Sequence, residues 1–372
     1  MNMHEGYMQR ALELAELGWG RTNPNPLVGA VIVKNGKIIA EGYHEKLGCA
    51  HAEVAAMNHA REDVRGATLY VNLEPCSHYG RTPPCAKAII ERGISEVIIA
   101  ITDPNPEVAG RGIKMLKEAG IQVVSGVLKK EAEKLNEIFI KYITKKRPFL
   151  IMKTAMTLDG KIATFQGDSK WISGESSRQH VHAVRDRVAA IMVGINTVLA
   201  DNPSLTTRLH SGKGKDAVRI VVDSKGVIPL DSEIINVKSS AGAILATTQA
   251  LDHDKERLLA EKGIQILKIN GPQGHVDLAK LMDELYMLGI DSVLLEGGGR
   301  LNAAALDSGI VDKVMTFIAP KMIGGENAIT SVEGAGTERM VNAVKLQDIS
   351  IRRFDEDILV EGYVKGDLCL QE

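Results

Sequence analysis

The chain has 372 residues, of which 44% are hydrophobic and 25% are charged, and its formal net charge is −2. Since roughly 100–200 residues make one domain, this length predicts two domains, each able to bury its own core. The small net charge argues against a nucleic-acid-binding surface that covers the whole protein. Four cysteines are too few for a secreted disulfide scaffold; they are Cys49, Cys76, Cys85 and Cys369.

Targeting and membrane segments are not evident in the sequence. No run reaches the roughly 18 apolar residues that a membrane span requires. Residues 1–10 lack the continuous apolar stretch of a signal peptide. We therefore expect a cytoplasmic protein.

Helices and strands alternate along the first part of the chain. Apolar residues at helical spacing over residues 8–15 predict a helix, and Asn35-Gly36 between two apolar runs predicts a β-hairpin. The other expected elements are helices over 52–61, 84–92, 113–119 and 129–144 and strands over 68–73, 97–101 and 121–124. This alternation predicts a layered α/β domain. Pro148 disfavours helix at the residue before it, so we expect domains over 1–146 and 147–372.

The second part restarts with an extended segment over residues 149–155 and is also predicted to be α/β. Its further strands are expected over 190–193, 219–222, 243–247 and 292–295, and its helices over 175–187, 255–262 and 278–288. Beyond Val311 the sequence predicts more strands joined by loops. No repeat of the first part is evident.

Residues suited to a zinc site cluster in the first domain. His51 opens a predicted helix, Cys76 follows a strand, and Cys85 lies nine residues further on. One imidazole and two thiolates are suitable zinc ligands, and three protein ligands leave a fourth position for water, as catalytic sites do. Zinc would turn that water into hydroxide near neutral pH, and Glu53 is placed to transfer its proton.

The order of these residues follows the zinc-deaminase pattern of H-x-E and then P-C-x-x-C, although eight residues separate Cys76 from Cys85. That longer spacing indicates a subfamily rather than a general cytidine deaminase. A buried cysteine is more often a small apolar residue than a ligand. Three ligand types, each at the end of an element, make that interpretation unlikely here. Cys49 and Cys369 have no partner spacing, and we treat them as structural or incidental.

The segments Asn25-Pro26-Leu27-Val28-Gly29, His51-Ala52-Glu53 and Leu73 to Cys85 resemble the deaminase half of a bifunctional family, the riboflavin-biosynthesis deaminase/reductases. The resemblance extends over about 145 residues and implies a three-layer fold like that of cytidine deaminase. It implies that His51, Cys76 and Cys85 bind zinc and that Glu53 is the catalytic proton shuttle. It also implies a set of substrate contacts, for which a turn-forming or solvent-exposed role is the alternative: Asn25, His44, His78 and Arg81.

A glycine-rich junction stands out in the second domain. A predicted strand runs into Gly297-Gly298-Gly299 and then into a helix. Backbone N–H groups at such a junction can approach a phosphate, and the helix dipole favours the anion. The junction lacks the G-x-G-x-x-G fingerprint. Taken alone, it is equally explained as a tight turn between a strand and a helix.

Four segments together resemble the reductase half of the same family: 153–163, 169–172, 194–208 and 295–302. The resemblance implies a fold like that of dihydrofolate reductase and the use of NADPH. The residues implied to bind the cofactor are Ala155, Trp171, Thr197, Asp201, Ser224, Gly298, Gly299, Arg300 and Leu301. Those implied to bind substrate are Lys153, Ser169, Arg185, Leu205, Arg208 and Glu296. A buried aromatic role for Trp171 and a surface role for Arg185 are the structural alternatives.

The resemblance implies two successive reactions. The first domain would deaminate 2,5-diamino-6-(5-phosphoribosylamino)pyrimidin-4(3H)-one to 5-amino-6-(5-phosphoribosylamino)uracil. The second domain would reduce the ribosyl group of that product to a ribityl group with NADPH. We expect a small-molecule substrate, no nucleic-acid or membrane partner, and a homo-oligomer.

Two other functions fit part of this pattern. A nucleic-acid or free-nucleoside deaminase would present basic and aromatic surfaces, but only 4% of the residues are aromatic. A structural zinc module would close its site with four ligands, and only three are convincing here.

Overall fold

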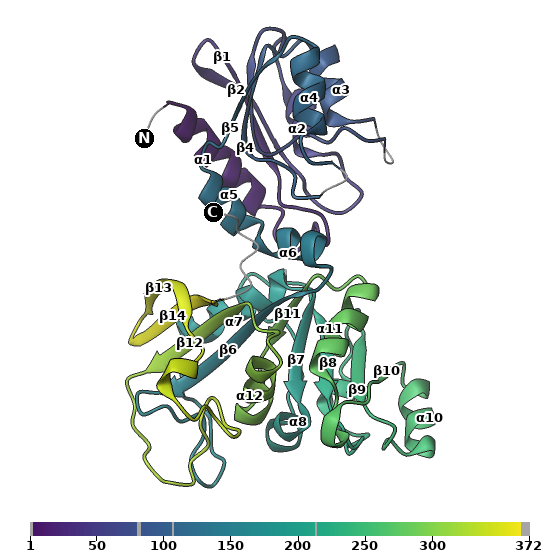
Figure 1. The fold of residues 1–372 in the computed structure, drawn as a ribbon, viewed down its shortest axis with the longest axis vertical. Helices are drawn as coiled ribbons and strands as arrows, with labels where there is room; N and C mark the ends of the chain where they lie inside the picture. The colour runs from purple at the N-terminus through teal and green to yellow at the C-terminus, as the bar shows by residue number, and fades with distance from the viewer. Residues whose placement is uncertain (1–2, 80–82, 106–107, 213, 366–372) are drawn as a thin grey trace. The chain divides into compact units, whose positions relative to one another are not determined.

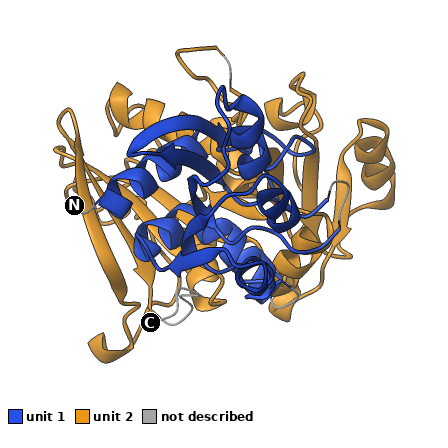
Figure 2. Ribbon diagram, turned by 90° about the horizontal axis from the view of Figure 1, so that it is seen from above, with its two compact units in different colours: residues 1–146, 369–372 blue, residues 147–368 orange. Residues whose placement is uncertain are grey.

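The fold is taken from a computed structural model, in which residues 3–79, 83–105, 108–212 and 214–365 are described. The chain forms two compact units, one ending at Lys146 and the other beginning at Arg147 (Figures 1 and 2). No helix within the described ranges is both long enough and apolar enough to cross a membrane.

The first unit contains one five-stranded sheet with helices on both faces (Figure 1). Its strands are β1 (Gly29–Lys34), β2 (Lys37–Tyr43), β3 (Thr68–Leu73), β4 (Glu96–Ile101) and β5 (Gln122–Ser125). Its helices are α1 (Met3–Glu16), α2 (Ala52–His59), α3 (Cys85–Glu91), α4 (Arg111–Glu118), α5 (Lys129–Leu135) and α6 (Glu137–Lys145). The strand order is β2-β1-β3-β4-β5, with β3, β4 and β5 parallel and β1 antiparallel to both neighbours.

The three layers of this unit follow from its contacts. Helices α1 and α5 cover one face of the sheet, and α2 packs on the other with α3 and α4 beside it. Glycine permits the closest approaches. A Cβ on Gly29 would lie 2.0 Å from the Ala11 carbonyl oxygen, and one on Gly42 would lie 2.3 Å from the Ala56 nitrogen. Only glycine fits such contacts. The three-layer prediction is therefore confirmed.

The predicted single helix over residues 129–144 is wrong in one respect. Asn136 interrupts it, and α5 and α6 lie on either side. The Asn136 side chain is buried and pairs with the main chain of Leu27 in a distant loop. This tertiary contact outweighs the local helical preference.

The second unit contains a nine-stranded sheet (Figure 1). Its strands are β6 (Phe149–Thr157), β7 (Ala190–Gly194), β8 (Val218–Val222), β9 (Ala243–Thr247), β10 (Gln265–Lys268), β11 (Ser292–Leu295), β12 (Lys313–Ala319), β13 (Leu346–Phe354) and β14 (Asp357–Val364). Its α-helices are α7 (Glu175–Arg187), α8 (Ile195–Asp201), α9 (Glu233–Asn236), α10 (His253–Glu261), α11 (Leu278–Met287) and α12 (Gly299–Asp307). Two short 3₁₀ turns are η1 (Pro272–Gly274) and η2 (Met340–Asn342).

The order of this sheet is β10-β9-β8-β7-β11-β6-β12-β14-β13. Strands β6 to β12 are parallel, and the β13–β14 hairpin adds an antiparallel edge. The chain runs outward from β7 to β10 and then returns through β11, between β7 and β6. Ligands of open α/β sheets bind at the carboxyl ends of strands where the order reverses. In this unit, the carboxyl ends of β6, β11 and β7 form that place.

Candidate active sites of the two units

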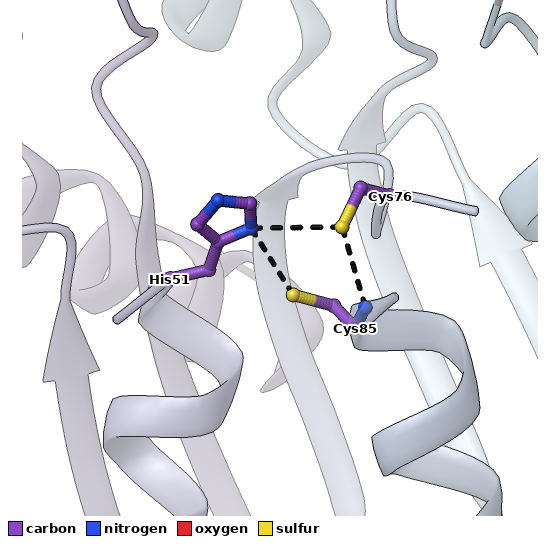
Figure 3. Close-up of side chains that lie close together, drawn as sticks. All are labelled: His51, Cys76 and Cys85. Carbon is purple, nitrogen blue, oxygen red and sulfur yellow. Dashed lines mark hydrogen bonds between the residues drawn. The ribbon is translucent and has the colours of Figure 1, made fainter. Parts of the chain in front are cut away.

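The three predicted zinc ligands meet at the N-terminal ends of two helices. His51 immediately precedes α2, Cys85 is the first residue of α3, and Cys76 lies three residues beyond β3. The Nδ1 atom of His51 lies 3.6 Å from the Cys76 sulfur and 3.3 Å from the Cys85 sulfur. All three ligand atoms lie within 4.8 Å of one another and face the same point (Figure 3). The donor set and its spacing fit a zinc ion.

Charge in this cluster is arranged for a cation. Hydrogen bonds from the Cys85 thiol and backbone N–H and from His51 lower the pKa of the Cys76 thiol to about 4. The pKa of Cys85 is raised, because its thiol donates to Cys76 and is buried. A bound metal would displace that remaining proton, since thiolates are the ligands.

Glu53 lies in the first turn of α2 and is only 3% exposed. Burial, reinforced by the nearby Cys76 thiolate, raises the pKa of Glu53 to about 7. A carboxyl group with such a pKa can both accept and return a proton at neutral pH.

His44 and Asn25 form a second pair in the first unit. Nδ1 of His44 donates to the Ala50 carbonyl at 3.1 Å, so its Nε2 is free to accept from the Asn25 amide at 3.2 Å. The His44 ring meets the His51 ring edge to face at 5.7 Å. Burial lowers the pKa of His44, which favours the neutral ring. The structure therefore brings Asn25 and His44 to the zinc ligands.

The other two predicted contacts of this site are His78 and Arg81. His78 is exposed in the segment that follows Cys76. Arg81 lies outside the described residues.

Glu74 holds the segment that carries Cys76, a function the sequence analysis did not assign. Its buried carboxylate accepts four backbone N–H groups, at distances of 2.9–3.1 Å. The donors belong to Asp103, Gly110, Gly112 and Ile113. A Cβ on Gly112 would lie 2.0 Å from the Pro75 carbonyl oxygen, so the start of α4 packs directly against the ligand segment.

In the second unit, the predicted substrate residues Lys153, Arg185 and Glu296 form one charge cluster, whose side chains are only 10–17% exposed. Lys153 comes from β6, Arg185 from α7, and Glu296 directly follows β11. Arg185 makes a bidentate contact with the Glu296 carboxylate, at 2.6 and 3.0 Å, and Lys153 lies 3.8 Å from it. The two cations lower the pKa of Glu296 to about 2 against the opposing effect of burial. Burial lowers the pKa of Lys153.

The loop that carries Leu205 and Arg208 adjoins this cluster. Arg185 Nη1 donates to the Thr206 carbonyl at 3.0 Å. Leu205 is buried and has a φ of 52°, in the left-handed region. Arg208 is exposed, and its Nη1 lies 3.4 Å from the Ser204 hydroxyl.

The predicted cofactor residues gather at the ends of two neighbouring strands, β7 and β11. Helix α8 starts directly after β7, and α12 starts at Gly299. A Cβ on Gly298 would lie 3.9 Å from the Thr197 hydroxyl, and one on Gly194 would lie 3.5 Å from Leu301. The predicted turn over 298–301 is therefore partly helix, because Gly299, Arg300 and Leu301 form the first turn of α12. Free N–H groups at its start fit a dinucleotide phosphate.

The other predicted reductase residues lie on β6, after β8, at the end of α8 and before α7. Ala155 lies on β6, and Ser224 follows β8 with its hydroxyl accepting the Val276 N–H. Asp201 is exposed at the far end of α8. Ser169 and Trp171 precede α7.

Trp171 is 63% exposed, which excludes the buried role. Arg178 stacks on its ring at 4.5 Å, and Lys321 donates to its carbonyl. One face of the ring thus has a fixed partner within the protein.

Comparisons with known proteins identify the family of both units. Residues 148–360 match the family model "RibD C-terminal domain", and residues 1–101 match the "Cytidine and deoxycytidylate deaminase zinc-binding region". The riboflavin biosynthesis protein RibD of Actinobacillus pleuropneumoniae is 51% identical over 96% of this chain and 94% of its own length. The chain belongs to the RibD family. RibD of Escherichia coli is 40% identical over 95% of this chain and 97% of its own.

Solved RibD structures give the same result. The deaminase/reductase of Thermotoga maritima superposes with a TM-score of 0.86 at 41% identity and covers 97% of this chain and 99% of its own. RibD of Acinetobacter baumannii gives a TM-score of 0.87 at 36% identity over 98% of this chain and 99% of its own. The predicted family and fold are confirmed: a cytidine-deaminase-like domain joined to a RibD reductase domain. As a RibD, the chain is a bifunctional enzyme of riboflavin biosynthesis, a zinc deaminase and a reductase.

Proposed function

We propose that residues 1–146 deaminate a diamino-pyrimidinone bearing a phosphoribosylamino group, and that residues 147–372 then reduce its ribosyl group to ribityl with NADPH. The observation that carries the proposal is the cluster of His51, Cys76 and Cys85 beside the buried carboxyl group of Glu53. Such an arrangement is a catalytic zinc site, because it leaves a ligand position open.

In the first reaction, His51, Cys76 and Cys85 would hold zinc. When bound, the ion supplies a Lewis acid that makes water nucleophilic at neutral pH. Glu53 takes a proton from the attacking water and delivers it to the departing amino group, so that water is consumed and ammonia released. Asn25 and His44 orient the pyrimidine, and His78 and Arg81 complete its contacts. Glu74 keeps the Cys76 segment in place.

In the second reaction, the carboxyl ends of β6, β7 and β11 would hold cofactor and substrate. Gly298, Gly299, Arg300 and Leu301 at the start of α12 would hold the pyrophosphate of the cofactor. When bound, the nicotinamide supplies the hydride that reduces the sugar carbon. The other proposed cofactor contacts are Ala155, Trp171, Thr197, Asp201 and Ser224.

The charge cluster would hold the sugar and its phosphate. Lys153, in the middle of β6, lies level with Glu296, which directly follows the neighbouring strand β11, and the ribose carbon would meet the nicotinamide there. Ser169, Leu205 and the two arginines Arg185 and Arg208 complete this proposed substrate set. Guanidinium groups suit a phosphate, because they make paired hydrogen bonds to its oxygens.

We also propose that the protein is cytoplasmic and forms a homo-oligomer. A site that depends on free thiols suits the reducing cytoplasm, and Cys49, Cys76 and Cys85 are free. The exposed apolar residues Ile349 and Ile351 on the edge strand β13 support a homo-oligomer, because such edges are usually covered. Sedimentation velocity tests the assembly.

Single substitutions test the division of labour. We expect Glu53→Gln to abolish ammonia release while the zinc content and the reduction of the deaminated substrate stay at wild-type levels. The reciprocal variant, Lys153→Ala, should abolish NADPH oxidation and leave ammonia release intact. Loss of both activities in a folded Glu53→Gln protein would contradict the assignment of one reaction to each unit.

A further inference from the structure

The loop formed by residues 204–208, which carries two of the proposed substrate contacts, is fixed by helix α7. Within it, Leu205 is buried and left-handed, with a φ of 52°. Residues other than glycine keep such a conformation only when the surrounding structure imposes it. The conformation of this loop therefore depends on its tertiary contacts.

Two residues on one face of α7 provide two of these contacts, and Asp216 provides a third by accepting the Thr207 N–H at 2.8 Å. His182 and Arg185 are three positions apart, so their side chains lie side by side on the helix. Arg185 donates to the Thr206 carbonyl at 3.0 Å, and Nδ1 of His182 accepts the Arg208 backbone N–H at 3.2 Å. The loop backbone is thus held on both sides of Thr207.

The contact with Arg208 requires a neutral imidazole. An Nδ1 atom that accepts an N–H has a lone pair, and the proton of the ring then lies on Nε2. The charged groups around His182 are Arg185 on the same helix, Arg208 on the loop, Lys153 on β6 and Glu296 after β11. Burial and then the two arginines lower the pKa of His182 to about 4, so the ring is neutral at pH 7.

Arg185 and Arg208 differ in how many of their guanidinium nitrogens already have a partner. Arg185 already uses Nε and Nη2 on Glu296 and Nη1 on Thr206. Arg208 is exposed, and its guanidinium contacts only the Ser204 hydroxyl, at 3.4 Å, among the described residues. Three cations face one carboxylate in this cluster, and a phosphate monoester has the nearly two negative charges that balance the difference. Arg208 is the arginine that remains available to it.

We propose that His182 is a positioning residue of the reductase: it fixes the backbone of Arg208, and thereby directs that guanidinium to the phosphate of the sugar substrate. The proposal rests on the proposed reductase function and adds a residue to it. His182 acts through Arg208 rather than on the reacting carbon. Its loss should therefore weaken recognition of the phosphate and leave the hydride transfer itself intact.

The test uses the full-length protein with His182→Leu, which removes the acceptor, and His182→Asn, whose amide oxygen lies at the same bond position as Nδ1 and can replace it. Ribose 5-phosphate and ribose are titrated into each protein by calorimetry. Kinetics are measured with the deaminated substrate and with its dephosphorylated form. We expect His182→Leu to weaken ribose 5-phosphate binding and raise the KM of the phosphorylated substrate about tenfold, the effect of one lost hydrogen bond. The turnover number, the KM for NADPH and the KM of the dephosphorylated substrate should change less than twofold, and His182→Asn should restore the affinity.

The outcomes separate this proposal from the function on which it rests. If His182→Leu binds ribose 5-phosphate as the wild type does, or loses both substrates equally, His182 does not position Arg208. A wild-type protein that does not bind ribose 5-phosphate would also overturn the proposal. If binding follows the expected pattern while the deaminated substrate is not reduced, the phosphate site stands and the proposed reaction is wrong. Should His182→Leu not fold, His182→Asn decides, because a tenfold loss there contradicts the proposal.

Discussion

The side-chain amide of Asn136 makes two hydrogen bonds to the main chain of Leu27. The Asn136 amide oxygen accepts the Leu27 N–H at 2.8 Å, and its amide nitrogen donates to the Leu27 carbonyl at 3.0 Å. Asn72 donates to the same carbonyl at 2.9 Å. All these groups are buried, so the loop that carries Asn25 is fixed by the junction between α5 and α6.

Replacement of Asn136 by alanine should destabilise the first unit. The Leu27 N–H would lose its partner in a buried position, at a cost of about 1–3 kcal/mol, while the Leu27 carbonyl would keep Asn72. Urea unfolding in a Trp171→Phe background measures this, because Trp19 then reports on the first unit alone. The matched control is Asn58→Ala at an exposed helical position, where we expect a change within about 0.5 kcal/mol. Equal effects of the two substitutions would contradict the role of the pair.

Serine in place of Cys85 should lower the zinc content and abolish deamination. A serine hydroxyl is a poor zinc ligand at neutral pH, because the ion prefers thiolate and imidazole. Metal analysis of the purified protein checks the expected fall from one zinc per chain. Cys49→Ser is the matched control, since Cys49 is free and does not belong to the ligand cluster. A zinc content that falls only in the control would show that the ligands are misassigned.

Glu74→Gln should weaken zinc retention without removing a ligand. The carboxylate accepts four N–H groups, whereas an amide offers one oxygen, and its NH₂ would face donors. The segment that carries Cys76 should loosen, so that zinc leaves faster to a chelator. Competition with a coloured chelator measures that rate. An unchanged rate would mean that the ligand segment keeps its geometry without Glu74.

Glu296→Gln should destabilise the second unit in a pH-dependent way. Lys153 and Arg185 would lose their carboxylate, and breaking a buried pair costs roughly 3–5 kcal/mol, which is an upper bound for these 10–17% exposed side chains at pH 7. The pKa of Glu296 is lowered to about 2, so its stabilising contribution is complete above about pH 4.5 and is lost as the pH falls through 2. The difference in the free energy of unfolding between wild type and variant should therefore decrease as the pH falls from about 4.5 to about 2.

Urea unfolding at several pH values, followed by Trp171 in a Trp19→Phe background, measures this difference. Glu284→Gln on the exposed face of α11 is the control and should show no such trend. A difference that stays constant down to pH 2 would contradict the charged role of Glu296.

The local sequence contains much of this fold. Asn35-Gly36 predicted the hairpin of β1 and β2 because both residues tolerate a positive φ, which is 51° and 72° here. The zinc ligands could also be predicted, because residue type and spacing alone specify such a site. Strand β10 and helix α8 were not predicted, since four and seven residues give too little periodicity.

Long-range contacts account for the residues that sequence reasoning missed. The break at Asn136 depends on Leu27, 109 positions away. His182 follows the helical pattern of α7 like any partly apolar residue, and only its contact with Arg208, 26 positions further on, distinguishes it. The four donors to Glu74 likewise come from a loop and the first turn of α4, which lie 29–39 residues away. None of these pairs has a spacing rule that a single sequence reveals.

The central claim, that the two units act in series, is tested most directly with purified, zinc-loaded protein and the diamino-pyrimidinone phosphoribosyl substrate. Ammonia and the absorbance of the reduced nicotinamide are followed together, with and without NADPH. We predict ammonia release without NADPH, and NADPH oxidation only after deamination has begun. Ammonia release with no NADPH oxidation would contradict the reductase assignment, and NADPH oxidation before any ammonia would contradict the proposed order.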